Sequence, residues 1–221
     1  MKVIVSAAVS VDGFIDDASS ERLVLSCGED WDEVRLLRAE CDAILVGAST
    51  LRNDNPALVT RSEELRRMRV NRGLPVDPVK VTVTGTGNLD PDLRFFSEGD
   101  GRKIVIAGAD ADTVRLSRLA PWAAIKRMDT VTARGIVNYL ERKGISTLLV
   151  EGGSRVLTMF FTEDAVDEVR LAVAPFFVGD REAPRLVGSG TFPFNVSRRM
   201  RLSDVRMVGD MAVMHYLLHD E

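Results

Sequence analysis

The pair Gly152-Gly153 is the stretch of the sequence best suited to bind a charged ligand. It separates the apolar run Leu148-Leu149-Val150 from a segment with apolar residues at helical spacing, which predicts a strand, a tight turn and a helix. Adjacent glycines allow backbone conformations that a Cβ atom forbids, and Ser154 follows at the position of a helix N-cap. Because unpaired N–H groups and the positive end of the helix dipole meet there, the turn predicts a phosphate or diphosphate site; the alternative is a plain turn.

Three acids occupy turns or strand ends, where open α/β sheets bind ligands: Asp12, Asp54 and Glu151. Asp12 and Asp54 fit equally well as residues that cap turns. Glu151 directly follows an apolar run, so it lies at the edge of an apolar interior and needs a partner there. Glu151 is therefore the acid that the pattern favours most as a functional residue.

An arginine-rich stretch covers residues 61–72, with five arginines and two glutamates. Such a run is typical of a solvated surface. Arg61 lies nearest to the turn at Asn55-Pro56, and a guanidinium offers a planar pair of donors to a phosphate. Arg61 is the arginine that we expect to hold a phosphate group.

Other motifs are weaker. Gly85-Thr86-Gly87 follows a predicted strand, but the dinucleotide fingerprint would need a glycine at Asp90, so this segment is either a simple turn or a loop beside a nucleotide. His215 and His219 are the only histidines, and they lack the helix and the glutamate of a zinc-hydrolase motif. We therefore expect no metal site and no histidine-dependent hydrolase.

Strands and helices alternate along most of the sequence. Apolar runs predict strands at 3–9, 43–47, 79–84, 103–107 and 148–150, and helical spacing predicts helices at 30–40, 110–119 and 132–142. In the first helix, an apolar stripe is expected to pack on the sheet; it consists of Trp31, Val34, Leu36 and Leu37. Residues 53–78 are polar and predict an excursion across the surface. Residues 168–174, 200–207 and 211–218 resemble strands, the last two joined in a hairpin, so we expect an α/β fold with a mixed sheet.

With 221 residues and 45% apolar content the chain could form one large domain or two small ones, and because no long linker interrupts it we expect a single domain over residues 1–221. A net charge of −4 provides no basic field for a nucleic-acid backbone. Cys27 and Cys41 are too few for a disulfide framework, and Val3-Ile4-Val5 is too short for a signal peptide or a membrane span. We expect a cytoplasmic protein that binds neither nucleic acid nor membranes.

Taken together, these segments resemble the reductase of riboflavin biosynthesis, nearly from end to end. The resemblance rests on Ser10-Val11-Asp12-Gly13, Leu25-Ser26-Cys27-Gly28-Glu29-Asp30, Leu37-Arg38-Ala39, Asp42-Ala43-Ile44-Leu45-Val46-Gly47, Thr50, Asp54-Asn55-Pro56-Ala57-Leu58, Arg61, Glu151-Gly152-Gly153, Val166-Asp167-Glu168 and Ala174-Pro175. It implies a three-layer dihydrofolate reductase-like fold, a mostly parallel mixed sheet with a C-terminal antiparallel hairpin, and a homodimer.

The same resemblance implies an activity and its residues. The family uses NADPH to reduce the ribosyl group of a phosphoribosylamino-pyrimidine to a ribityl chain. By motif, the substrate contacts are Leu58, Arg61 and Glu151, the catalytic residues are Asp54 and Glu151, and the cofactor contacts are Val9, Thr50, Asp54, Gly85, Gly152, Gly153, Ser154, Arg155, Val156 and Leu157. Two alternatives stay open: a related reductase of a pterin or another heterocycle, and a dinucleotide-binding protein without catalysis.

Overall fold

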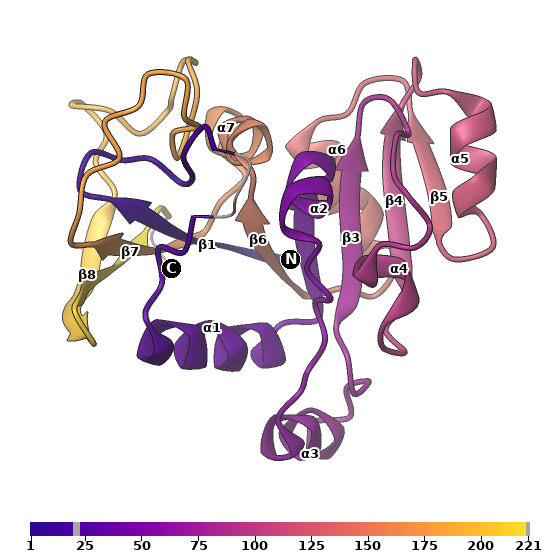
Figure 1. Cartoon of the computed structure of the whole chain (residues 1–221), viewed down its shortest axis with the longest axis horizontal. Coiled ribbons are helices and arrows are strands. Elements are labelled where there is room, and N and C mark those ends of the chain that lie inside the picture. Colours follow the sequence, from indigo (N-terminus) through magenta and orange to yellow (C-terminus); the bar gives the residue numbers. More distant parts are fainter. Residues whose placement is uncertain (20–22, 220–221) are drawn as a thin grey trace.

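A computed structural model describes residues 1–19 and 23–219 of the chain, and all strands in this part belong to one sheet (Figure 1). The sheet has the order β5-β4-β3-β2-β6-β1-β7-β9-β8. The strands are β1 (Lys2–Ser10), β2 (Ala43–Gly47), β3 (Val79–Thr84), β4 (Lys103–Gly108), β5 (Ala124–Met128), β6 (Thr147–Gly152), β7 (Glu168–Ala174), β8 (Arg201–Val208) and β9 (Met211–Leu217). Every pairing among β1 to β7 is parallel, whereas β9 runs antiparallel to both β7 and β8. The predicted mixed sheet and C-terminal hairpin are confirmed.

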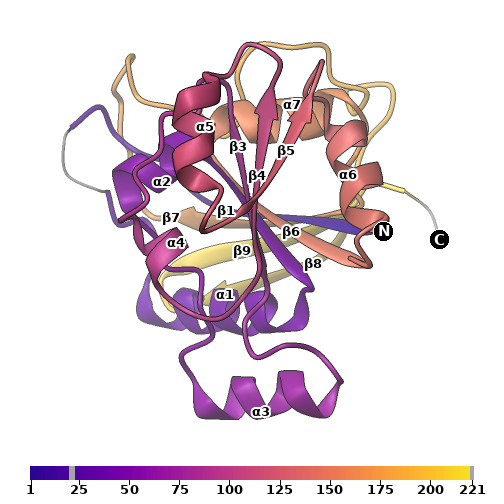
Figure 2. The same ribbon diagram turned by 90° about the vertical axis from the view of Figure 1, so that its right-hand side faces the viewer.

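Helices cover both faces of the sheet, which buries its central strands. The helices are α1 (Gly28–Glu40), α2 (Ala48–Asp54), α3 (Glu63–Asn71), α4 (Arg94–Ser97), α5 (Thr113–Leu119), α6 (Ala133–Glu141) and α7 (Ser154–Thr162). Apolar side chains of α6 and α7 pack on one face, and those of α2, α4 and α5 pack on the other. Figure 2 shows α5 and α6 on opposite sides of β3, β4 and β5. Successive residues of a strand point to opposite faces, so each apolar run of the central strands contributes side chains to the apolar cores on both faces of the sheet.

Helix α1 differs from the expectation of an apolar stripe packed on the sheet. It buries only Asp30 and Ala39, while Leu36 remains 43% exposed. Its contacts with the sheet include ion pairs from Arg38 to Glu151 of β6 and from Asp30 and Glu33 to Arg170 of β7. The expected stripe holds in part: Leu37 packs against a buried apolar cluster and Trp31 and Val34 are half-buried, whereas Leu36 is exposed and charged side chains supply further contacts with the strands.

The polar segment 53–78 is not a plain surface loop, because α3 forms within it. Ser62 caps this helix with its side chain, which accepts from the N–H of Leu65. The prediction of a solvated arginine face is wrong at Arg69, which is fully buried and donates to the carbonyl oxygens of Ala39, Cys41 and Pro75. These carbonyl groups accept from Nε and Nη1, whereas Nη2 of Arg69 has no hydrogen-bond partner among the described residues.

The sequence patterns also missed β5 and α4. Strand β5 lies at the edge of the sheet, and its sequence Ala-Ile-Lys-Arg-Met carries two cations in place of an apolar run. Helix α4 has only four residues. Among the described residues, no helix is both long enough and apolar enough to cross a membrane.

Candidate active site

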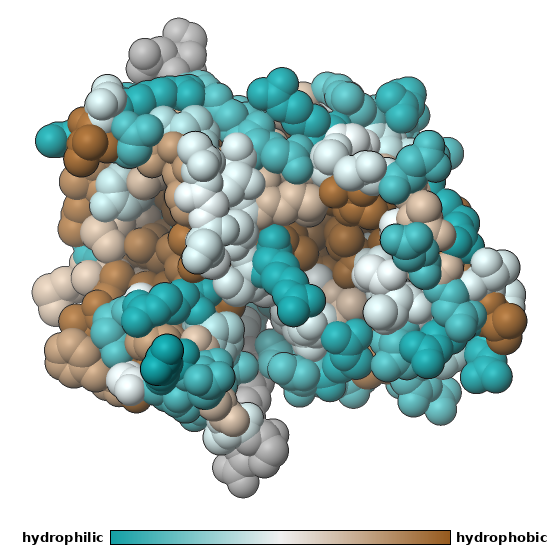
Figure 3. Space-filling model, turned by 90° about the horizontal axis from the view of Figure 1, so that it is seen from above, coloured by the Kyte–Doolittle hydropathy of each residue, from teal (hydrophilic) through white to brown (hydrophobic). Residues whose placement is uncertain are grey.

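A cleft of about 1300 Å³ lies between α1, the start of α2, the start of α7 and the strands that precede them. Its lining includes Ala7 and Ala8 of β1, Gly85 after β3, and Glu151 of β6. Seen from above, the molecule has hollows in which apolar residues gather between polar surroundings (Figure 3). Ligands of open α/β sheets bind at the carboxyl ends of the strands, which makes this cleft the candidate site.

The turn between β6 and α7 forms one wall of the cleft. Gly152 has φ +119°, a conformation that residues with a Cβ rarely adopt, and its peptide bond to Gly153 is cis. The N-cap of α7 is Gly153, one residue before the expected Ser154, which is the first helical residue. Since Gly153 has no side chain, no side-chain cap bonds the first N–H groups of α7. The predicted strand–turn–helix is confirmed, and its helix start retains donors for an anion.

A second helix begins directly beside this turn. Strand β2 pairs with β6, and Gly47 at its end caps α2, again with no side-chain hydrogen bond. A Cβ on Gly47 would lie 3.2 Å from Cγ2 of Val156 and 3.4 Å from the backbone nitrogen of Gly153. A Cβ on Gly153 would lie 3.2 Å from the Thr50 hydroxyl oxygen. Close packing of glycines thus brings the N-termini of α2 and α7 together, a geometry that fits the diphosphate of a dinucleotide.

Glu151 has the partner that its position demands. Nε of Arg38 donates to Oε1 of Glu151 at 2.6 Å, and the terminal Nη2 donates to Oε2 at 2.8 Å. The two side chains are 21% and 11% exposed. Burial works to lower the pKa of Arg38, but the Glu151 carboxylate outweighs burial and raises that pKa. The bidentate pair fixes the direction of the Glu151 carboxylate in the wall of the cleft.

Asp12 acts as a turn residue, which is the alternative that its sequence position left open. Its carboxylate accepts hydrogen bonds from the Ser10 hydroxyl at 2.6 Å and from the N–H groups of Val178 and Gly179. Loss of surrounding water raises the pKa of Asp12, but these hydrogen bonds outweigh that effect and lower the pKa to about 2. Asp12 does not line the cleft. It ties the segment after β1 to the segment after β7.

Arg61 lies at the edge of the cleft and is 64% exposed in its side chain. It donates to Oε2 of Glu98 at 2.8 Å, while Arg94 donates to Oε1 at 2.5 Å. The Arg94 guanidinium, followed by that of Arg61, lowers the pKa of Glu98. A phosphate bound by Arg61 would therefore compete with Glu98 for the same guanidinium.

Most of the residues that the sequence indicated come together in this cleft. Those that line it are Thr50, Asp54, Leu58, Arg61, Gly85, Glu151, Gly153, Ser154, Arg155, Val156 and Leu157. Three do not line it: Asp12 lies in its turn, Val9 is buried in β1, and Gly152 is buried in the turn before α7.

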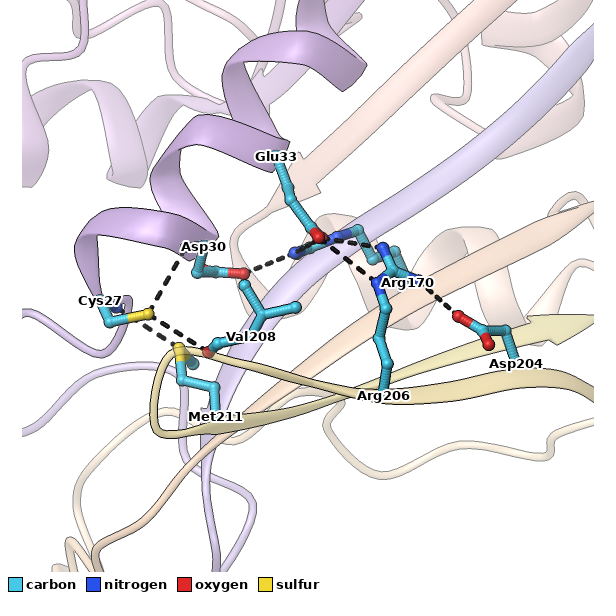
Figure 4. Close-up of polar contacts among 8 residues, drawn as sticks. All are labelled: Cys27, Asp30, Glu33, Arg170, Asp204, Arg206, Val208 and Met211. Atoms are coloured by element: carbon cyan, nitrogen blue, oxygen red, sulfur yellow. Dashed lines mark hydrogen bonds and ion pairs between the residues drawn. The ribbon is translucent and has the colours of Figure 1, made fainter.

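A group of charged residues beneath α1 was missed by the sequence reasoning. Asp30 and Arg170 both line the cleft, and Nη2 of Arg170 lies 2.6 Å from Oδ1 of Asp30 and 2.7 Å from Oε2 of Glu33 (Figure 4). Glu33 also accepts from Arg206 of β8. The available signal was the spacing of Asp30, Glu33 and Arg38, which places an acid or base on nearly every turn of one helix. Among the described residues, no cluster of three or more histidine, cysteine or acidic side chains could hold a metal ion.

Comparison with known proteins identifies the chain's relatives. Residues 1–214 match the family model described as the RibD C-terminal domain. The chain is 31% identical over 210 residues to the 2,5-diamino-6-ribosylamino-4(3H)-pyrimidinone 5′-phosphate reductase of Archaeoglobus fulgidus, covering 94% of both proteins.

Solved structures agree on the fold. A pyrimidine reductase-like protein from Corynebacterium diphtheriae superposes with a TM-score of 0.83 at 20% identity, over 100% of this chain and 92% of that one. Dihydrofolate reductase from Enterococcus faecalis superposes with a TM-score of 0.51 at 11% identity, over 99% and 97%. The fold is therefore that of the dihydrofolate reductase-like reductases, and the chain belongs to the RibD C-terminal domain family.

Proposed function

We propose that this chain, acting as one domain over residues 1–221, is an NADPH-dependent reductase of riboflavin biosynthesis. Its substrate would be a phosphoribosylamino-pyrimidine, whose ribosyl group is reduced to a ribityl chain. The observation that carries the proposal is the meeting of two uncapped helix starts, at Gly47 and Gly153, in the cleft that also holds Glu151 and Arg38. The similarity to the reductase of Archaeoglobus fulgidus supports it.

The start of α7 would bind the cofactor's diphosphate through backbone N–H groups. Residues 152–157 supply this segment, and the Thr50 hydroxyl of α2 lies close to Gly153, 3.2 Å from where a Cβ would stand. Gly85 would lie beside another part of the cofactor, since it lines the same cleft at the end of the neighbouring strand β3. Val9 is buried in β1, so it would support the residues that contact the cofactor. The bound cofactor supplies a hydride.

On the substrate side, Arg61 would hold the phosphate and Leu58 would contact the apolar part of the substrate. Glu151, aimed by Arg38, would accept hydrogen bonds from ribose hydroxyl groups. In the ring-opened imine form of the substrate, the sugar carbon is electrophilic and the imine nitrogen must gain a proton when the carbon gains hydride. Asp54, or a water molecule held in the cleft, would deliver that proton. Positioning the reacting atoms at about 3–3.5 Å would supply much of the rate.

The test is a substrate panel with oxidation of NADPH as the readout. The proposal predicts turnover of the ribosylamino-pyrimidine phosphate and formation of a ribityl product, with NADPH preferred over NADH. Turnover of dihydrofolate alone would favour a pterin reductase. Binding of NADPH in a calorimeter without oxidation by any candidate would favour a non-catalytic dinucleotide-binding protein.

We also propose that the protein is a homodimer in the cytoplasm. Strand β8 ends the sheet and exposes apolar side chains, Leu202, Val205 and Met207, the last of them 82% exposed. Exposed apolar groups on an open strand edge favour association with another chain. Both cysteines are free thiols, which suits a reducing compartment. Sedimentation of the purified protein tests the dimer, and a monomer at micromolar concentration would contradict it.

A further inference from the structure

A short segment without helix or strand, residues 57–61, carries two of the proposed substrate contacts, Leu58 and Arg61. It lies between α2 and α3 and lines the cleft along its whole length. Val59, Thr60 and Arg61 also line a second hollow, of about 330 Å³. Because the segment borders open space in both hollows, side-chain packing holds it only in part, and its position depends on hydrogen bonds to neighbouring elements.

Lys80 of β3 holds the beginning of this segment. The side chain is fully buried, and its ammonium group donates to three carbonyl oxygens: that of Ala57 at 2.5 Å, that of Glu98 at 2.7 Å and that of Phe95 at 3.3 Å. Ala57 immediately precedes Leu58, whose φ of +50° is uncommon for a residue with a Cβ and needs support from its surroundings. One ammonium group thus ties the segment both to β3 and to α4.

Asp77, which lies just before β3, holds the end of the segment. Its carboxylate is buried; Oδ1 accepts from the N–H of Thr60 at 2.7 Å, and Oδ2 accepts from the N–H of Asp100 at 3.1 Å. A Cβ on Gly99 would lie 2.6 Å from Oδ2 of Asp77, so the loop after α4 packs closely here. Since Thr60 immediately precedes Arg61, the backbone that carries this arginine is fixed from behind.

We propose that Lys80 is a positioning residue, which fixes the segment 57–61 so that Arg61 meets the substrate's phosphate. This inference rests on the proposed function and deepens it, because Lys80 does not line the cleft and touches no ligand there. The Arg61 side chain is largely exposed and shares the Glu98 carboxylate with Arg94. The place of its backbone therefore decides where the guanidinium can reach.

The protonation state of Lys80 controls the strength of its hydrogen bonds. Burial, followed by the neighbouring Lys103, lowers the pKa of Lys80 to about 8. Arg94 also lowers this pKa, whereas Asp77 and Glu98 act in the opposite direction. The ammonium form offers three charged donors to three carbonyl groups, but the neutral amine has two donors and a lone pair that would face a carbonyl oxygen. The hold on the segment should weaken as the pH rises through about 8.

The experiment measures kcat and KM for the phosphoribosylamino-pyrimidine, and KM for NADPH, in the wild-type protein and two variants. At neutral pH, Lys80→Met should raise KM for the phosphorylated substrate about tenfold, while kcat and the KM for NADPH change less than about twofold. Lys80→Arg retains a charged group with several donors, so it should restore the wild-type KM.

The pH profile separates positioning from a merely structural role. In the wild-type protein, KM for the phosphorylated substrate should rise at least about threefold between about pH 7 and about pH 9.5, because Lys80 loses its charge in that range. In Lys80→Arg it should stay level, since a guanidinium remains charged. Both proteins meet the same ionisation of the substrate, so a difference between their profiles reports residue 80.

The matched control is Lys103→Met. Lys103 pairs with Lys80 in register between β3 and β4, and its ammonium group donates to the carbonyl oxygen of Gly99 at 2.9 Å, outside the segment 57–61. The variant removes the same charge from the neighbouring strand. It should leave both KM values as in the wild-type protein at neutral pH.

Equal KM values for the phosphorylated substrate in Lys80→Met and Lys103→Met would overturn the inference while leaving the proposed reductase in place. Parallel pH profiles for the wild-type protein and Lys80→Arg would also overturn it. Thermal unfolding reports whether each variant folds; if neither Lys80 variant does, a level wild-type profile overturns the inference and a rise for the substrate without one for NADPH supports it. Failure of the wild-type protein to reduce the substrate at any pH would instead overturn the proposed function, and the inference with it.

Discussion

Replacing Arg38 by methionine tests whether the ion pair with Glu151 holds the cleft wall in place. The substitution removes both hydrogen bonds to Glu151, at 2.6 and 2.8 Å, and keeps an unbranched apolar stem. Glu151, only 11% exposed, would then be a nearly buried carboxylate without its counter-ion. Breaking a fully buried pair costs about 3–5 kcal/mol, and partial solvation of Arg38 places this case near the lower end, at about 3 kcal/mol.

The assay is urea unfolding of four proteins followed by circular dichroism. Arg35→Met is the control, because Arg35 pairs with Asp32 on the exposed side of the same helix and its loss should change the free energy of unfolding by about 0.5 kcal/mol. The double variant Arg38→Met/Glu151→Leu removes both charges and should recover to within about 1 kcal/mol of the wild-type protein. It should still lack reductase activity.

Two results would refute this reasoning. The first is a loss of stability in Arg38→Met no larger than that in Arg35→Met, which would mean that the pair contributes nothing as a buried contact. The second is a double variant that is as unstable as Arg38→Met. Arg38 would then stabilise the protein through its packing over the Trp31 ring, 5.7 Å from the ring centroid, and not through its charge.

Three further expectations concern other parts of the molecule. Arg61→Ala should weaken binding of the phosphorylated substrate by about 1.5–3 kcal/mol and leave NADPH binding unchanged in calorimetry; equal losses for both ligands would remove Arg61 from the substrate site. Gly152→Ala should lower the free energy of unfolding by about 1–3 kcal/mol, because φ is +119° at Gly152, and it should also weaken NADPH binding. The control is Gly28→Ala, where a Cβ meets nothing within 4 Å, and it should change neither stability nor binding. Equal behaviour of the two variants would contradict the account of the turn. Burial raises the pKa of the Cys41 thiol to about 12, so a disulfide reagent at pH 8 should leave Cys41 unmodified until the protein is unfolded, and rapid labelling of the native protein at Cys41 would disprove its burial.

The sequence predicted the parts of the fold that depend on local pattern. Central strands such as Ala43–Gly47 are apolar on both faces, and the glycine pair before α7 marks its turn directly. The sequence did not predict the edge strand Ala124–Met128, because the strand is partly exposed and its lysine and arginine interrupt the apolar pattern. Helix α3 was missed because its sequence is strongly polar and buries a single residue, Arg69.

The candidate site could be predicted only where one segment carries the signal. Glu151 revealed its need for a partner, but the identity of that partner depends on how α1 crosses the sheet, which no local pattern encodes. The same is true of Asp30 and Arg170, which are separated by 140 residues in the chain. Long-range pairs of charges require the tertiary structure, because neither member of a pair identifies the other in the sequence.

The position of β6 sets the order of events during synthesis. It lies between β1 and β2, so these early strands do not pair with each other. Lys2 and Asp42 form hydrogen bonds with Ser146 and Thr147 that are possible only once β6 has been made. Pairing between segments so distant in the chain is slow to form. A nascent chain that ends before this strand contains the strands of one sheet portion, β5-β4-β3-β2, and the single strand β1, which has no paired neighbour until β6 is made. The same strand carries the glycine turn, so joining β1 to β2 and forming the turn wall of the ligand cleft are a single step.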